Sequence, residues 1–238
     1  MRRLASKSHE KLYATLTHGG RFCASPDPKM RRIGAEILDE VINPDREHVE
    51  AVAATLIPIS QAETEPSALS ATIHALGRVG SRDSVLAIAA HATHADPQVR
   101  LTVARALPPT YTDGIEPETY LPTLLALSAD DHDEVRNWAC FGLGTQFNDD
   151  SPELRAALAA RLCDQHENTR AEAIVGLARR GDPRALPALI QAFEDGHAGR
   201  LLFQAAAWIG DESLVPYLKG FERDEEVEQA LEGCNPRR

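Results

Sequence analysis

Residues 131–144 read DHDEVRNWACFGLG, and this phrase decides the fold because variants of it recur along the chain. Each copy has an acidic or proline-containing turn, an apolar residue, often an arginine, then Ala and Leu at helical spacing, and usually a glycine. The other copies are SPDPKMRRIGAEIL at 25–38, EPSALSATIHALGRVG at 65–80, ADPQVRLTVARAL at 95–107, HENTRAEAIVGLARRG at 166–181 and a degenerate GHAGRLLFQAAAWIG at 196–210. Their equivalent leucines lie 38, 31, 36 and 34 residues apart, at Leu38, Leu76, Leu107, Leu143 and Leu177. This spacing indicates a helical repeat.

Each copy has the apolar spacing of an amphipathic helix, as Val135, Ala139 and Leu143 show at i, i+4 and i+8. A second helix is predicted between copies, most clearly over residues 182–195, with Asp182 as its N-cap and Pro183 in its first turn. Glycines are predicted to end four helices: Gly80, Gly144, Gly181 and Gly210. No segment alternates as a strand does, so the sequence predicts an all-α chain.

The ladder of D-x-x-V-R, Leu, Gly and D-P resembles HEAT repeats of the phycobilisome-lyase HEAT-like type over roughly residues 25–220. The resemblance implies a right-handed α-α superhelix, a solenoid of about six helix pairs, with the V-R helices on its concave side. We expect an N-terminal basic cap helix at 1–24, the HEAT-repeat solenoid at 25–220, and an acidic C-terminal cap and tail at 221–238.

Charge is unevenly distributed along the 238 residues. Lys and Arg number 25 against 36 Asp and Glu, a net charge of −11. The first 32 residues hold eight basic and two acidic side chains, so the remaining 206 carry −17. This acidic body favours a basic protein partner and makes general nucleic-acid binding unlikely. No apolar run is long enough for a membrane span and the start lacks a signal-peptide core, so we expect no membrane association and a cytoplasmic location.

Recurrent arginines occupy one position of the repeat: Arg31, Arg100, Arg136 and Arg170. In HEAT-like families the matching arginine commonly reaches an aspartate in the turn of a neighbouring repeat. The resemblance therefore implies a structural ladder, for which Asp96, Asp131 and Asp133 are the candidate acceptors.

The sequence predicts no catalytic residue, no metal site and no cofactor. His91 and His94 are expected to be ordinary helix-surface residues. The His-Glu pairs that hold di-iron in the HEAT-like deoxyhypusine hydroxylases are missing; Asn137-Trp138 and Ala171-Glu172 stand at two of the matching positions. Four scattered cysteines suggest reduced thiols.

Helical arithmetic predicts which side chains of the V-R helices face away from the apolar stripe. The predicted partner-binding residues on or beside this concave face are Arg105, Asn137, Trp138, Phe141, Glu172, Arg179, Arg200, Gln204 and Trp208. For Trp138 and Trp208 the alternative is that they fill space between repeats.

These residues favour a non-enzymatic protein-interaction module or scaffold that binds a basic protein on its concave face. A narrower hypothesis is an immunity protein that neutralises a basic toxin. The enzymatic alternatives are a lyase acting on a tetrapyrrole chromophore and a HEAT-type DNA glycosylase.

Overall fold

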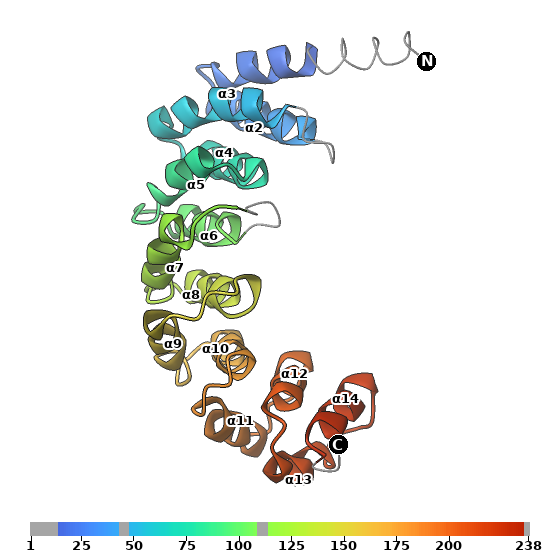
Figure 1. The fold of residues 1–238 in the computed structure, drawn as a ribbon. Helices are drawn as coiled ribbons and strands as arrows, with labels where there is room; N and C mark the ends of the chain where they lie inside the picture. Colours follow the sequence, from blue (N-terminus) through green and yellow to red (C-terminus); the bar gives the residue numbers. More distant parts are fainter. Residues whose placement is uncertain (1–13, 43–47, 109–113, 236–238) are drawn as a thin grey trace. The chain divides into compact units, whose positions relative to one another are not determined.

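The computed structural model describes residues 14–42, 48–108 and 114–235. Within these ranges the chain consists of α-helices joined by loops and by short 3₁₀ and π-helical turns, and it contains no strand (Figure 1). The predicted all-α class is therefore confirmed. In the described ranges the helices α2 to α13 follow one another in the number expected for six pairs, and α14 comes after them.

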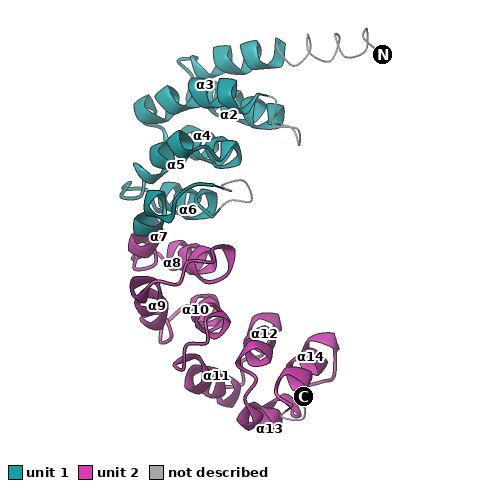
Figure 2. Cartoon of the chain, viewed as in Figure 1, with its two compact units in different colours: residues 1–123 teal, residues 124–238 magenta. Residues whose placement is uncertain are grey.

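The chain divides into two compact units, residues 1–123 and 124–238 (Figure 2). After a helix over residues 14–23, the first unit contains α2 (Pro28–Val41), α3 (Val49–Ala62), α4 (Pro66–Val79), α5 (Arg82–Ala89), α6 (Pro97–Ala106) and η1 (Pro117–Thr119). Within it α2 packs on α4 and α4 on α6, while α3 and α5 form a second layer against them. The boundary between the units falls inside α7 (Leu121–Leu127).

The second unit repeats this two-layer arrangement. Its elements are α8 (Asp133–Phe141), η2 (Gly142–Gln146), α9 (Pro152–Ala159), α10 (Glu167–Arg179), α11 (Ala185–Glu194), α12 (Arg200–Ile209), η3 (Glu212–Leu214), α13 (Val215–Leu218) and α14 (Glu225–Gly233). The helices α8, α10, α12 and α14 pack in series, and we call them the inner layer. Figure 2 shows them on the inner side of the bend within this unit, with α9, α11 and α13 on the outer side.

Capping residues explain where several helices begin. The carboxylates of Asp27 and Asp96 accept hydrogen bonds from the backbone N–H of Lys29 and Gln98, at 2.9 and 2.8 Å. Each aspartate precedes a proline at the first helical position, where the missing N–H costs nothing. At the other end, α4 and α12 stop at Gly80 and Gly210, whose φ angles of 60° and 66° favour glycine.

The repeated leucines form the core. Leu38, Leu76, Leu107, Leu143 and Leu177 are all 0% exposed. A fully buried leucine contributes about 1.5–3 kcal/mol relative to an exposed one. The position used to align the copies is therefore the position around which the helices pack.

Two sequence-based helix boundaries need correction. Helix α8 ends at Phe141 instead of continuing to Gly144, because a π-helical turn, η2, follows it. Helix α11 begins at Ala185 and not at Pro183. The Asp182 carboxylate accepts a hydrogen bond from the backbone N–H of Arg184 at 3.1 Å, which closes a separate turn before the helix.

The predicted ends lie partly outside the described residues. Of the N-terminal cap at 1–24, residues 1–13 fall outside, as do residues 236–238 of the C-terminal tail. Within the segment expected to be an acidic cap, α14 packs on α12 and continues the inner layer.

Candidate functional site

An exposed stripe runs along α12. Arg200, Gln204 and Trp208 are spaced four residues apart and all three are exposed, as the helical arithmetic predicts. Trp208 keeps 42% of its surface exposed, although tryptophan gains most from burial. The adjacent helix α14 therefore leaves this indole accessible.

A pair of aromatic rings lies on α8, at the other end of the same layer. Trp138 and Phe141 make a T-shaped contact, with ring centroids 5.5 Å apart and an interplanar angle of 79°. Residues three apart on a helix are neighbours, so the sequence spacing alone brings these rings together. Both side chains are half-buried, as is Asn137 beside them.

Between α8 and α12, helix α10 presents a buried carboxyl group. Glu172 is only 8% exposed, and its Oε2 atom is buried without a hydrogen-bond partner. Burial raises the pKa of Glu172 to about 7, because nothing beside it stabilises the charged form. Val175 lies five residues after Arg170, a spacing that also predicts a place on the concave face. It is fully buried, so this part of the surface differs from that prediction.

Arg179 is tied to the end of η2. Its guanidinium donates to the carbonyl oxygen of Thr145 and to Oδ1 of Asn148, both at 2.6 Å. These two hydrogen bonds hold the side chain of Arg179, a predicted partner-binding residue, against the segment that follows α8. Arg105, by contrast, lies on α6 in the first unit, where it is exposed.

The neighbouring Arg180 was missed by the sequence reasoning. Its side chain is only 5% exposed, and its guanidinium donates to the carbonyl oxygens of five residues: Leu143, Gly144, Phe147, Asp149 and Gly176. Arg180 thus holds the π-helical turn and the loop after it against α10. The only signal in the sequence was a second arginine at a helix end, which usually indicates a solvated residue.

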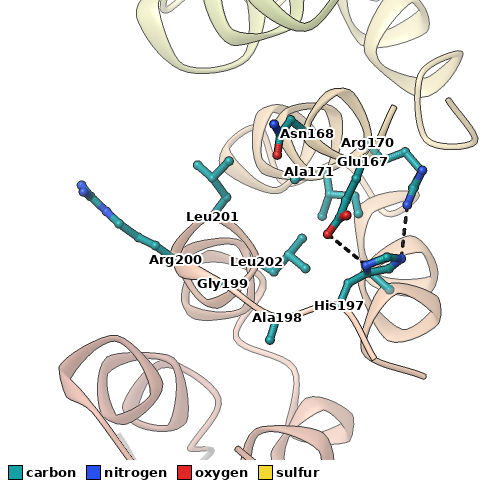
Figure 3. Close-up of a pocket in the computed structure, with 12 residues that line it drawn as sticks. Glu167, Asn168, Arg170, Ala171, His197, Ala198, Gly199, Arg200, Leu201 and Leu202 are labelled. Carbon is teal, nitrogen blue, oxygen red and sulfur yellow. Dashed lines mark hydrogen bonds and ion pairs between the residues drawn. The ribbon is translucent and has the colours of Figure 1, made fainter. Parts of the chain in front are cut away.

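A pocket of about 200 Å³ opens where α10 and α12 begin (Figure 3). Ala171, Ile174 and Leu202 supply apolar walls, and Arg200 of the stripe lies at its edge. Figure 3 shows His197 between Glu167 and Arg170, with Arg200 pointing away from them. The pocket therefore adjoins the exposed stripe of α12.

The recurrent arginines link successive repeats. Arg31 donates to both carboxylate oxygens of Glu63 at 2.7 and 2.8 Å, and Arg136 donates to both of Asp164 at 2.8 Å. Nη2 of Arg170 lies 3.2 Å from Nε2 of His197. Each of these partners stands two residues before the N-cap of the next inner helix.

Two of the acidic residues named for this ladder, Asp96 and Asp133, were wrong. Asp96 uses its carboxylate to cap α6, and Asp133 accepts a hydrogen bond from the backbone N–H of Glu134 at 2.8 Å. The side chains of Arg31, Arg136 and Arg170 instead extend to the next repeat and meet the residue two positions before its N-cap. Arg100 donates at 2.9 Å to the carbonyl oxygen of His94, in the turn before its own helix.

The part of the chain that the structure describes holds neither a metal cluster nor a membrane span. There, no group of three or more His, Cys, Asp or Glu side chains is arranged to hold a metal ion. No described helix combines the length and the apolar character needed to cross a membrane. All four cysteines are free thiols.

Comparison with known proteins identifies the repeat. A family model described as HEAT repeats matches residues 52–136 and 121–208, which together make up well over half of the chain. The chain belongs to the HEAT-repeat family. This confirms the HEAT-repeat resemblance at the level of the family.

Curated relatives include the protein YibA from Escherichia coli K-12, which is 34% identical over 104 residues, and YibA from E. coli O157:H7 gives the same values. The match covers 44% of this chain and 37% of YibA, so it spans little more than a third of that relative.

Among solved structures, that of E. coli YibA has a TM-score of 0.74 at 24% identity, covering 93% of this chain and 81% of the other. An engineered protein has a TM-score of 0.52 at 16% identity, covering 92% and 95%. At these identities both structures support the fold alone.

Proposed function

We propose that this HEAT-repeat protein is a non-enzymatic interaction module that binds a basic protein on the inner layer of its second unit. The exposed stripe of α12 carries the proposal, above all Trp208, which is 42% exposed. Trp and Arg are the side chains that most often dominate protein–protein binding energy. Arg200 and Trp208 supply one of each on a single face of α12.

Charge supports a basic partner. Residues 124–238 contain 21 acidic and 12 basic side chains, so this unit carries −9 of the chain's net −11. Several of its arginines donate to acceptors of their own chain, including Arg136, Arg155 and Arg180. Acidic surroundings would speed encounter with a basic protein and make the association salt-dependent.

The packed layer also supports binding. Helices α8, α10, α12 and α14 pack in series through buried apolar side chains, so a partner meets a preformed surface and little ordering entropy opposes binding. The recess between α10 and α12 offers apolar walls for one side chain of the partner. HEAT repeats generally mediate protein interactions, which agrees with this use of the surface.

The narrower parts of the proposal concern the identity of the partner and the cellular compartment in which it is bound. The partner is a basic protein such as a toxin that this chain neutralises, and the association takes place in the cytoplasm. The phycobilisome-lyase HEAT-like subtype of the repeats also belongs to the proposal, without the lyase activity. These points rest on charge and on the motif resemblance.

Site-specific photo-crosslinking in the source cells tests the proposal. A benzophenone amino acid at Gln204 on α12 is compared with the same group at Gln191, an exposed residue of the outer helix α11. We expect position 204 to capture a basic protein that position 191 does not. Trp208→Ala should abolish the adduct while leaving the far-UV circular dichroism unchanged.

Equal capture at both positions, or an adduct insensitive to salt and to Trp208→Ala, would contradict the proposal. A tetrapyrrole pigment that copurifies with the chain would instead support the lyase alternative. Salt-sensitive retention on DNA would support the glycosylase alternative.

A further inference from the structure

Glu172 is a buried acid that the fold leaves unpaired. Its carboxyl group forms no hydrogen bond and no ion pair with any described residue, and Oε2 is fully enclosed. A buried carboxylate without a partner is costly, so such groups in proteins are usually paired. The fold gains nothing visible from this residue, although the equivalent positions on α8 and α6 are occupied by the uncharged Trp138 and Thr102.

A second unpaired acceptor lies on the helix that packs against it. Oδ1 of Asn137 on α8 is also buried without a hydrogen-bond partner. Helices α8 and α10 pack against each other, and Cys140, one helical turn after Asn137, interacts electrostatically with Glu172. Neither oxygen has a donor from the described residues, and once Glu172 is ionised the N–H groups of a cation would supply one.

Two aromatic rings lie on the same helix as Asn137. Trp138 directly follows Asn137 in the sequence, and its ring contacts that of Phe141. Aromatic faces attract guanidinium and ammonium groups. Arginine carries five N–H donors in a planar fork and accepts no hydrogen bonds, so it can serve several acceptors and stack on a ring at once.

We propose that Glu172, together with Oδ1 of Asn137, is the seat for the guanidinium group of an arginine supplied by a basic protein partner. The inference rests on the proposed function and specifies its chemistry: the partner inserts an arginine between α8 and α10. This site differs from the ladder of recurrent arginines. In the ladder an arginine of this chain binds an acidic residue of this chain, whereas Glu172 has no arginine of the described residues beside it.

Burial raises the pKa of Glu172 to about 7, as expected for a buried carboxyl group that has no cation beside it in the unbound chain. A guanidinium beside the carboxyl would favour its charged form. A lysine ammonium offers charge but only three donors on one atom, so it should fill the seat less well. A trapped water could also donate to both acceptors, but it would give no selectivity for charge.

Nuclear magnetic resonance of the full chain, with ¹³C at the glutamate side-chain carboxyl groups, tests the seat directly. The Glu172 signal is assigned by its absence from Glu172→Gln. Hexa-arginine peptide is the probe, and hexa-citrulline, which has nearly the same shape without the charge, is the control. We expect a saturable shift of the Glu172 signal with arginine that is absent with citrulline and smaller with hexa-lysine.

A matched pair of variants distinguishes the contribution of Glu172 to partner binding from that of the acidic surface in general. Glu153 on α9 is exposed, so Glu153→Gln removes the same charge from the outer layer. Glu172→Gln should weaken binding of the captured partner by about thirtyfold or more, as for a buried charge pair, whereas Glu153→Gln should change it little.

A Glu172 signal that ignores arginine, or that responds equally to citrulline, would overturn the seat. If position 204 still captured a protein in a Trp208-dependent way, the proposed function would stand without it. If arginine shifted Glu172 but position 204 captured nothing, the cation seat would remain and the protein-binding function would fail.

Discussion

Arg136 on α8 donates a bidentate pair of hydrogen bonds to Asp164, which lies in the turn before α10. Nε donates to Oδ2 and Nη2 donates to Oδ1, both at 2.8 Å. The same guanidinium donates through Nη1 to the carbonyl oxygen of Asp130 at 3.0 Å, in the turn before its own helix. One side chain therefore fixes two turns at once, which sets the distance and register between consecutive repeats. The pair is well shielded, with the side chains 13% and 3% exposed.

Replacing Asp164 with asparagine should destabilise the second unit by about 2 kcal/mol, because a hydrogen bond to a charged group is lost. Urea denaturation followed by circular dichroism measures the change in the free energy of unfolding. The single variant Arg136→Lys should also lose stability, since a lysine ammonium cannot make the bidentate hydrogen bonds of the guanidinium. The exposed pair of Arg32 and Glu36 is the control, and Arg32→Gln should leave stability nearly unchanged. An equal loss from both variants would contradict this role.

The same pair predicts acid sensitivity. Burial alone would raise the pKa of Asp164, but the hydrogen bonds from Arg136 and from the backbone N–H of His166 outweigh it and hold the pKa below its ordinary value. The folded pKa is lower than the unfolded one, so the contribution to stability is complete above about pH 4 and lost as the pH falls through the folded pKa. Asp164→Asn should therefore show less acid destabilisation than the parent chain.

Arg180 should matter more for stability than an arginine at a helix end usually does. Arg180→Met keeps most of the apolar stem but leaves five carbonyl oxygens without this donor, so we expect a loss of about 3 kcal/mol or more. Hydrogen exchange should reveal the loss locally, as faster exchange over residues 142–149. Arg223→Met, at an exposed pair with Glu228, is the matched control. Unchanged protection of the π-helical turn would show that the guanidinium does not hold it.

The repeat pattern predicts what each copy shares, and it fails where one copy departs from the others. The period and the leucine positions follow from the sequence because every copy must bury the same face. The stripe of Arg200, Gln204 and Trp208 follows from helical spacing for the same reason. Acceptors such as Glu63 could not be chosen from the sequence, because the reach of an arginine depends on how the repeats stack.

The π-helical turn and the buried arginine belong to one repeat only. Gly144 and Gly176 lie on facing elements, and the equivalent close approach in the first unit joins Gly77 and Ala106. Glu172 was chosen for its place on the predicted face, but its burial depends on the side chains around it. Periodicity cannot supply that information.

Gly176→Ala tests this close approach. An alanine Cβ would stand 2.7 Å from Cα of Gly144 and 2.7 Å from Cδ1 of Leu158, so backbone would have to move. In an open helix alanine is favoured over glycine by about 1 kcal/mol, whereas here we expect a destabilisation of about 2 kcal/mol. Gly20→Ala is the control, because its Cβ would have 4.0 Å to the nearest side chain, that of Thr55. Thermal or urea unfolding of the two variants should therefore change in opposite directions, and a stabilising Gly176→Ala would refute the contact.

The unpaired carboxyl of Glu172 should make the chain less stable as the pH rises. Burial raises its pKa to about 7 in the folded state, against an ordinary value of about 4.3 in the unfolded state. Between these values the folded chain holds the extra proton, so its contribution is fully present below about pH 4 and is lost progressively up to about pH 7. The loss is of the order of 3 kcal/mol.

Glu172→Gln, which is uncharged at every pH, should remove this dependence and leave the variant more stable than the parent above pH 7. Urea denaturation at pH 5 and pH 8 measures both effects, with Glu153→Gln as the exposed control. Parallel pH profiles for the parent and Glu172→Gln would mean that the carboxyl is paired or solvated after all, and would remove the physical basis for an arginine seat.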